Sequence, residues 1–202
     1  MRDLSPVTSS HRPTQRNRPK PGGVLGLIFA AWLVLGVTGV PMQAQEPLQV
    51  AKAQVILAAN GAHPESAIKA AVVVRIAAGY HINAHHPSLN YLIPTEVRFS
   101  PLARAKVLKV IYPAGRAVHF SFSKTPLSVY EGEVPIGLMV KVGRTGRASE
   151  IILHGQLSYQ ACNDHACFAP TSIPLVVTVP VLPPNVPLKP AHSAIFSRLR
   201  FN

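Results

Sequence analysis

The chain is poor in acidic residues. Only eight of its 202 residues are aspartate or glutamate, against 20 lysines and arginines, so its formal charge is +12 at pH 7. The basic residues are scattered, and no aromatic residues alternate with them in a stripe of the kind that binds nucleic acid. The excess charge therefore indicates a solvated basic surface, and no nucleic-acid partner is expected.

Helical periodicity and internal repeats are also missing. After residue 45, no segment repeats apolar residues at the spacing of an amphipathic helix, and no stretch of sequence recurs. The 20 prolines gather in the two tails and at the ends of apolar runs, which suits strands separated by turns. Because 48% of the residues are hydrophobic, a disordered chain is excluded.

Residues 1–44 are expected to form a targeting segment. A cationic, proline-rich stretch precedes residues 24–40, an apolar run without a charge. As a helix this run would span about 25 Å, at the lower edge of what crosses a bilayer. It is therefore either a signal peptide cleaved after Ala44 or a retained anchor in contact with the membrane. Both place the rest of the chain outside the cytoplasm, where disulfides persist.

Residues 45–182 are expected to form one β-domain. Apolar and polar side chains alternate with a period of two in three clear segments, 68–77, 134–142 and 151–160. Residues 183–202 form a proline-rich, basic tail that we expect to be extended or disordered. About eight short strands with Gly, Pro and Asn turns predict an all-β fold, an antiparallel sandwich. The other strand candidates are residues 50–58, 80–83, 95–99, 106–111 and 173–181.

The only cysteines, Cys162 and Cys167, have four residues between them. As a purely structural disulfide, a bond that closes so short a loop would contribute only about 2 kcal/mol of stability. A domain of this size also has enough hydrophobic core to fold without it. The spacing suits a redox pair, in which one thiolate attacks a partner's disulfide and the other resolves the complex. It is not the CxxC of thioredoxins, so a helix N-terminus is not implied. A structural disulfide stays as an alternative.

The surroundings of the pair add two expectations. If the strand at 151–160 continues, Cys162 falls opposite the apolar face and near the surface, where a partner can reach it. His165 lies between the cysteines and, as a cation, would favour a thiolate, whereas Asp164 would oppose it. The direction of their combined effect stays open.

A metal-binding module is a further alternative. Cys162, His165 and Cys167, joined by one more histidine, would supply the sulfur and imidazole ligands that zinc or copper prefers. However, Cys-x4-Cys is at the loose end of zinc spacing and no second CxxC is present, so neither a metal nor another cofactor is expected. The histidines that could join them are His81, His85 and His86.

Three stretches of the chain follow a recognisable pattern. The most specific is Tyr159-Gln160-Ala161-Cys162, followed after four residues by Cys167-Phe168-Ala169-Pro170. The others are Gly79–His85 with Leu92–Thr95, and Val129–Val134. Together they resemble the DsbD amino-terminal (alpha) domain family over about residues 48–181. The cysteine spacing is one residue shorter than in the best-known member of that family.

The resemblance implies an immunoglobulin-like fold for the β-sandwich and an electron-relay activity. The signal or anchor helix expected from the apolar run would precede this sandwich. In this family the dithiol is reduced by a thioredoxin-like domain fed from a membrane domain, and it reduces disulfide isomerases and cytochrome c maturation thioredoxins. Cys162 and Cys167 match the two redox cysteines, with Cys162 forming the mixed disulfide. An aromatic cap loop shields them, which makes Phe120 or Phe122 the candidate shield. The alternative is that these two are aromatic residues on a strand face in the core.

The sequence contains neither the eight-helix membrane domain nor the C-terminal thioredoxin domain of the family. We therefore expect a thiol:disulfide oxidoreductase component whose electron donor is another polypeptide. Its expected location is the bacterial periplasm, secreted or anchored to the inner membrane. Its expected partners are thioredoxin-fold redox proteins and a membrane electron transporter. The competing hypothesis is a non-catalytic immunoglobulin-like binding or assembly module with a structural disulfide.

Overall fold

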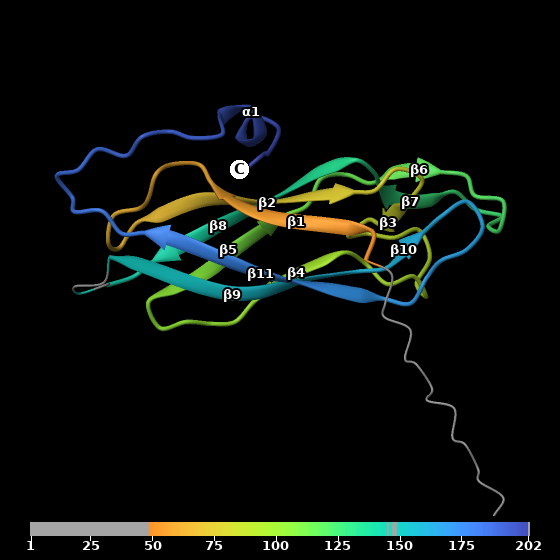
Figure 1. The fold of residues 1–202 in the computed structure, drawn as a ribbon, viewed down its shortest axis with the longest axis horizontal. Coiled ribbons are helices and arrows are strands. Elements are labelled where there is room, and N and C mark those ends of the chain that lie inside the picture. The colour runs from red at the N-terminus through yellow and green to blue at the C-terminus, as the bar shows by residue number, and fades with distance from the viewer. Residues whose placement is uncertain (1–48, 145, 147–148, 202) are drawn as a thin grey trace, which may run out of the picture. The chain divides into compact units, whose positions relative to one another are not determined.

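The computed structural model describes residues 49–144, 146 and 149–201, which are mostly antiparallel β-structure (Figure 1). The prediction of an all-β, antiparallel fold is confirmed. The apolar run at residues 24–40, predicted as a signal or anchor helix, lies outside the described residues. Within the described ranges, no helix has the length and hydrophobicity needed to cross a membrane.

Two sheets form the core. Each is antiparallel, and alternate residues of the segments predicted from the sequence point into one shared apolar cluster. Because both sheets contribute to this cluster, they pack face to face as a sandwich. The first sheet has the order β1 (Ala51–Leu57), β2 (Ala67–Ile76), β8 (Glu133–Val142), β5 (Ala105–Ile111), and the second β11 (Thr171–Pro180), β9 (Glu150–Tyr159), β4 (Glu96–Phe99).

A third, smaller sheet lies at one end of the sandwich, on the right in Figure 1. It contains one of the cysteines, and its strands are two to four residues long. Strands this short show no period-two pattern. The periodicity of the sequence therefore missed three of the four, and only the family resemblance indicated one of these, β7 (Leu127–Tyr130). The order is β10 (Ala161–Cys162), β3 (His81–Asn83), β7 (Leu127–Tyr130), β6 (Arg116–Val118).

The C-terminal segment differs from the expected extended or disordered tail. After a stretch without helix or strand, it forms the single-turn helix α1 (Ser193–Phe196). Leu199 is then buried against Ala71 and Val73 on the outer face of the first sheet. The prolines and arginines of the tail led to the expectation of an extended or disordered segment. Its apolar residues instead pack on the apolar outer face of the first sheet. These residues are Ile195, Phe196, Leu199 and Phe201.

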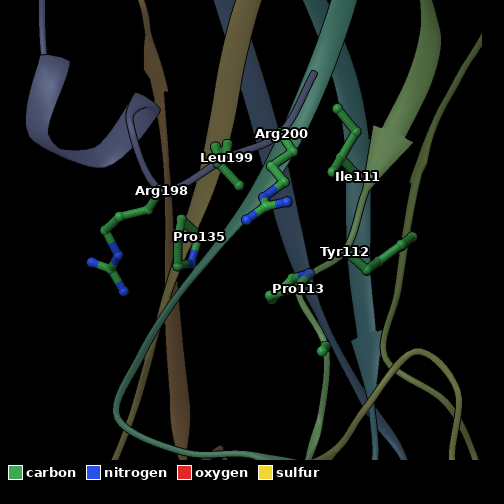
Figure 2. A pocket seen from close by; sticks show the side chains of 8 residues that line it. Ile111, Tyr112, Pro113, Pro135, Arg198, Leu199 and Arg200 are labelled. Carbon is green, nitrogen blue, oxygen red and sulfur yellow. The ribbon is translucent and has the colours of Figure 1, made fainter. Parts of the chain in front are cut away.

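This packing also shapes a pocket. Figure 2 shows Leu199 and Arg200 on one side and the end of β5 on the other. The pocket has a volume of about 380 Å³, and its walls are mainly apolar apart from two arginine side chains. The lining residues are Ile111, Tyr112, Pro113, Ala114, Pro135, Arg198, Leu199 and Arg200.

Leu199→Ala is expected to lower the free energy of unfolding by about 2 kcal/mol, because it deletes a side chain that is only 8% exposed. Urea denaturation of the purified chain measures the change. Leu188→Ala is the matched control, since Leu188 belongs to the same segment but is 41% exposed, and it should change stability by less than about 0.5 kcal/mol. Equal effects of the two substitutions would contradict the packing of this segment.

Candidate functional site

The two cysteines are bonded to each other. Their sulfurs are 2.02 Å apart and their Cα atoms 3.9 Å apart, and the two residues also form an isolated antiparallel bridge. Cys162 is fully buried and Cys167 is partly buried. The prediction that Cys162 lies near the surface is therefore wrong. It assumed that β9 continues, but β9 ends at Tyr159 and the chain passes into β10 of the small sheet, so the alternation along β9 does not reach Cys162.

The turn between the cysteines is set by Asn163. Its side-chain oxygen accepts hydrogen bonds from the backbone N–H groups of His165 and Ala166, each at 2.9 Å. Such a contact of an asparagine with its own backbone is the usual device of a tight turn. His165 and Asp164 lie exposed at the tip of this hairpin. The backbone oxygen of Asp164 accepts a hydrogen bond of 2.7 Å from the Ser121 hydroxyl. An effect of His165 or Asp164 on the thiolate stays a prediction.

A partly buried polar network fixes the hairpin to the rest of the domain. The Gln160 amide donates to the Phe168 carbonyl at 3.1 Å, and its oxygen accepts from the Asn83 amide at 3.0 Å and the Ile93 backbone at 3.1 Å. The Asn83 side-chain amide also donates to the Ile93 carbonyl, and the backbone carbonyl of Asn83 accepts from the Thr95 hydroxyl at 2.5 Å. Asn83 and Thr95 are both fully buried. The network joins the segment around Asn83 to the segment around Gln160, which lie far apart in the sequence. The sequence alone did not reveal this contact.

The segment at residues 119–124 lies against the hairpin. Phe120 is 5% exposed, and its ring meets that of His81 edge to face with centroids 5.1 Å apart. Phe122 is 41% exposed and stacks on Phe120 at 5.3 Å. The structure thus brings both candidate shield residues to this end of the domain, and their shielding role stays a prediction. Phe120 shares an apolar cluster with Leu92, Leu127 and Val129, against which Cys167 packs.

His81 is the histidine that adjoins the disulfide in the sheet. It is the register partner of Cys162, where β3 pairs with β10. Its Nε2 atom lies 3.2 Å from a carboxylate oxygen of Glu131, which also pairs with Arg116. Its Nδ1 atom is buried and has no hydrogen-bond partner among the described residues. The sequence analysis considered His81 only as a possible metal ligand, because nothing in the sequence shows which strand faces β10.

Residues 44–175 match the family described as "Thiol:disulfide interchange protein DsbD, N-terminal". The chain belongs to this family. The match covers more than half of the chain and includes both cysteines and the three stretches that carry the family resemblance. At the level of the family, a DsbD N-terminal domain with its two cysteines bonded is a thiol–disulfide exchange module.

Two solved structures are similar to this DsbD-family domain. One is the N-terminal periplasmic domain of ScsB from Proteus mirabilis, with a TM-score of 0.44 and 15% identity over 63% of this chain and 47% of that one. The other is the Neisseria meningitidis DsbD N-terminal domain in the reduced form, with a TM-score of 0.40 and 16% identity over 63% of this chain and 85% of that one. The chain thus spans about half the length of the ScsB domain. No curated protein sequence matches the chain.

His85, the second histidine of the stretch at residues 79–85, packs against a tyrosine ring and a backbone carbonyl. Its ring stacks on Tyr112 with centroids 3.6 Å apart and an interplanar angle of 6°, and its Nδ1 atom lies 3.0 Å from the Thr95 carbonyl. Tyr130 accepts a hydrogen bond from the His85 backbone and donates one to the Pro113 carbonyl. Burial raises the pKa of both phenols, Tyr112 and Tyr130, above the ordinary value. These contacts join the loop after β3 to the loop after β5.

The structure does not assemble the metal site that the sequence left open. Cys162 and Cys167 are bonded to each other, so neither sulfur is a free thiolate ligand in this state. In the part of the chain that the structure describes, no group of three or more His, Cys, Asp or Glu side chains is placed to hold a metal ion.

Proposed function

We propose that this chain is an extracytoplasmic thiol–disulfide exchange module that relays electrons through Cys162 and Cys167 to or from thioredoxin-fold partners. The observation that carries the proposal is the disulfide between the chain's only two cysteines, closed across a short hairpin in a domain of the DsbD family. Most of the sandwich core lies in the two other sheets, and the small sheet adds Ile82, Tyr130 and Ala161 to it. A staple across so short a loop adds little to such a core.

The chemistry transfers two electrons. In the reduced protein, the Cys162 thiolate attacks one sulfur of a partner's disulfide, a new bond joins the two proteins, and the partner's other sulfur leaves as a thiolate. Cys167 then attacks the Cys162 sulfur and releases the partner's second sulfur. The Cys162–Cys167 disulfide is restored and the partner is reduced. The same steps in reverse, with an electron donor as the partner, reduce the disulfide to the dithiol again.

The burial of Cys162 limits how a partner can reach it. Cys162 is fully buried, and Phe120 belongs to the apolar cluster against which Cys167 packs. Access to Cys162 therefore requires local opening of this end of the domain, and the segment around Phe120 is the part that would move. Such a cap would keep small oxidants and reductants from the dithiol while a docked partner opens it.

The partners and location follow from the family and the sequence. Thioredoxin-fold redox proteins would accept electrons, in disulfide reduction or cytochrome c maturation, and a membrane electron transporter would supply them. The similar ScsB domain is described as periplasmic. The basic stretch before the apolar run at residues 24–40 has the same implication, because positive charge stays on the cytoplasmic side.

Trapping tests the proposal. The Cys167→Ser variant cannot resolve the mixed disulfide, so it should accumulate complexes with extracytoplasmic thioredoxin-fold proteins. Non-reducing electrophoresis and mass spectrometry of the full chain expressed in a periplasm would detect them, with the Cys162→Ser, Cys167→Ser double variant as control. Trapping by Cys162→Ser alone would reverse the roles of the cysteines. If neither single variant traps a partner, the relay proposal is wrong.

The full burial of Cys162 also favours a second candidate, a non-catalytic immunoglobulin-like binding module with a structural disulfide. The reduction potential separates the two. Structural disulfides have potentials below about −300 mV, whereas catalytic pairs are more oxidising. Equilibration of the chain with glutathione or dithiothreitol buffers, followed by alkylation and mass spectrometry, measures this value.

A further inference from the structure

A buried thiol must lose its proton before it can react. The nucleophile in thiol–disulfide exchange is the thiolate, and apolar burial disfavours that charged form. In the oxidised structure Cys162 is fully buried, whereas His165 and Asp164 lie exposed at the tip of the hairpin. A group that takes the proton of a reduced Cys162 is therefore to be sought within the sheet.

His81 occupies the corresponding place. Residues directly opposite each other in an antiparallel pair point to the same face, with Cβ atoms about 4.5–5.5 Å apart, and His81 is opposite Cys162. The His81 side chain is 14% exposed, and the Phe120 ring packs against it. The imidazole and the Cys162 sulfur thus share one sheltered face of the small sheet.

Glu131 sets the orientation of the imidazole. A carboxylate oxygen 3.2 Å from Nε2 favours the tautomer that carries its hydrogen on Nε2, because a carboxylate can only accept. In the neutral ring, Nδ1 then carries the lone pair. Among the described residues this buried atom has no hydrogen-bond partner in the oxidised state, and a buried acceptor without a donor is unfavourable. Reduction of the disulfide creates one new donor on the opposite residue, the S–H of Cys162.

We propose that His81, oriented by Glu131, is the proton acceptor for Cys162 in the reduced protein, an inference that deepens the proposed exchange function. The proton passes from the Cys162 sulfur to Nδ1, and the electron pair left on the sulfur forms the bond to the partner's sulfur. The resulting imidazolium faces the Glu131 carboxylate, in the manner of a carboxylate that orients a catalytic histidine.

The surroundings of the ring support this path. Glu131 is its charged neighbour, Arg116 stands behind Glu131, and Phe120 covers the ring without adding a charge. Tyr80 is the other titratable residue that lines a surface pocket with His81 and Glu131. This pocket has a volume of about 340 Å³ and gives the proton an exit to solvent. Arg116 neutralises Glu131 in part, so Glu131 acts mainly by orienting the ring.

The test measures Cys162 alone, without a partner protein. The full chain carrying Cys167→Ser is reduced, and its alkylation by iodoacetamide is followed by mass spectrometry across pH 5–10 (roughly the range in which thiols and imidazoles titrate). When His81→Gln is added, alkylation should be about tenfold slower at pH 7, and the profile of rate against pH should lie at higher pH. The reason is that a thiol pKa higher by about one gives about tenfold less thiolate. Glu131→Gln, which keeps the side-chain size, should act in the same direction with a smaller effect.

His154→Gln is the matched control, because His154 lies exposed on β9, and its profile should coincide with that of the parent. Thermal unfolding of each variant checks the fold, and if His81→Gln unfolds the domain, Glu131→Gln decides the question. An unchanged profile in the folded variants would overturn the proposal, as would a shift produced by His165→Gln instead. Since the readout needs no partner, this result is separate from trapping, which can fail or succeed on its own.

Discussion

Phe120→Ala is expected to destabilise the domain by about 3 kcal/mol and to make its disulfide at least about tenfold more accessible to dithiothreitol, since about half of that loss falling on the cap is enough for one factor of ten. The side chain is 5% exposed and contacts both the His81 ring and the cluster against which Cys167 packs. Truncating a buried phenylalanine typically removes about 3–5 kcal/mol. If the closed cap limits access, each 1.4 kcal/mol lost from its packing raises the open population about tenfold. Urea denaturation gives the stability, and the rate of disulfide reduction gives the access.

The neighbouring phenylalanine provides the control for this experiment. Phe122 is 41% exposed and contacts Phe120 from outside, so Phe122→Ala should change stability by less than about 1 kcal/mol and the reduction rate much less than Phe120→Ala does. Loss of stability without faster reduction in Phe120→Ala would show that this ring is a core residue and not a shield, the alternative left open by the sequence.

The second large effect is expected from Asn83→Leu, which should lower the free energy of unfolding by about 3 kcal/mol. Asn83 is fully buried, and its amide donates to both Gln160 and the Ile93 carbonyl. Leucine has a similar size but no donor, so the Ile93 carbonyl loses this partner and the Gln160 oxygen keeps only the Ile93 N–H. A buried polar group left without a partner costs about 1–3 kcal/mol. Denaturant unfolding of the oxidised protein measures the loss.

A double-mutant cycle shows whether the network acts as assigned. Asn83→Ala and Gln160→Ala share the broken hydrogen bond, so their effects should be non-additive by about 1 kcal/mol. Gln156→Ala is the control, because Gln156 is an exposed residue of β9, and its effect should add to that of Asn83→Ala. Full additivity between Asn83→Ala and Gln160→Ala would contradict the proposed link between the hairpin and β3.

The sequence predicted the parts of the fold that repeat a simple pattern. Alternation along β2, β8 and β9 identified the strands and the residues that face the core, such as Val72 and Leu138, because a long strand with one buried face must alternate. The short strands of the small sheet give no such pattern. The burial of Cys162 was missed for the same reason, since the chain changes sheet at Gln160, between β9 and β10.

The sequence identified the two cysteines of the candidate site but not the residues around them. Cys162 and Cys167 were singled out as a pair, and the structure bonds them to each other; their role in exchange stays a prediction. His81, Glu131 and Arg116, however, come from three separate segments and meet only through strand pairing. The sequence drew attention to His165 because it is adjacent along the chain, whereas the sheet brings His81 next to Cys162 instead.

The small sheet that contains Cys162 is joined to the core of the sandwich. Ile82, Tyr130 and Ala161 from its strands belong to the large apolar cluster of the two main sheets, while Cys167 packs against a smaller cluster. Because Ala161 directly precedes Cys162 in β10, a shift of the backbone at the disulfide would be transmitted to the main core through this alanine.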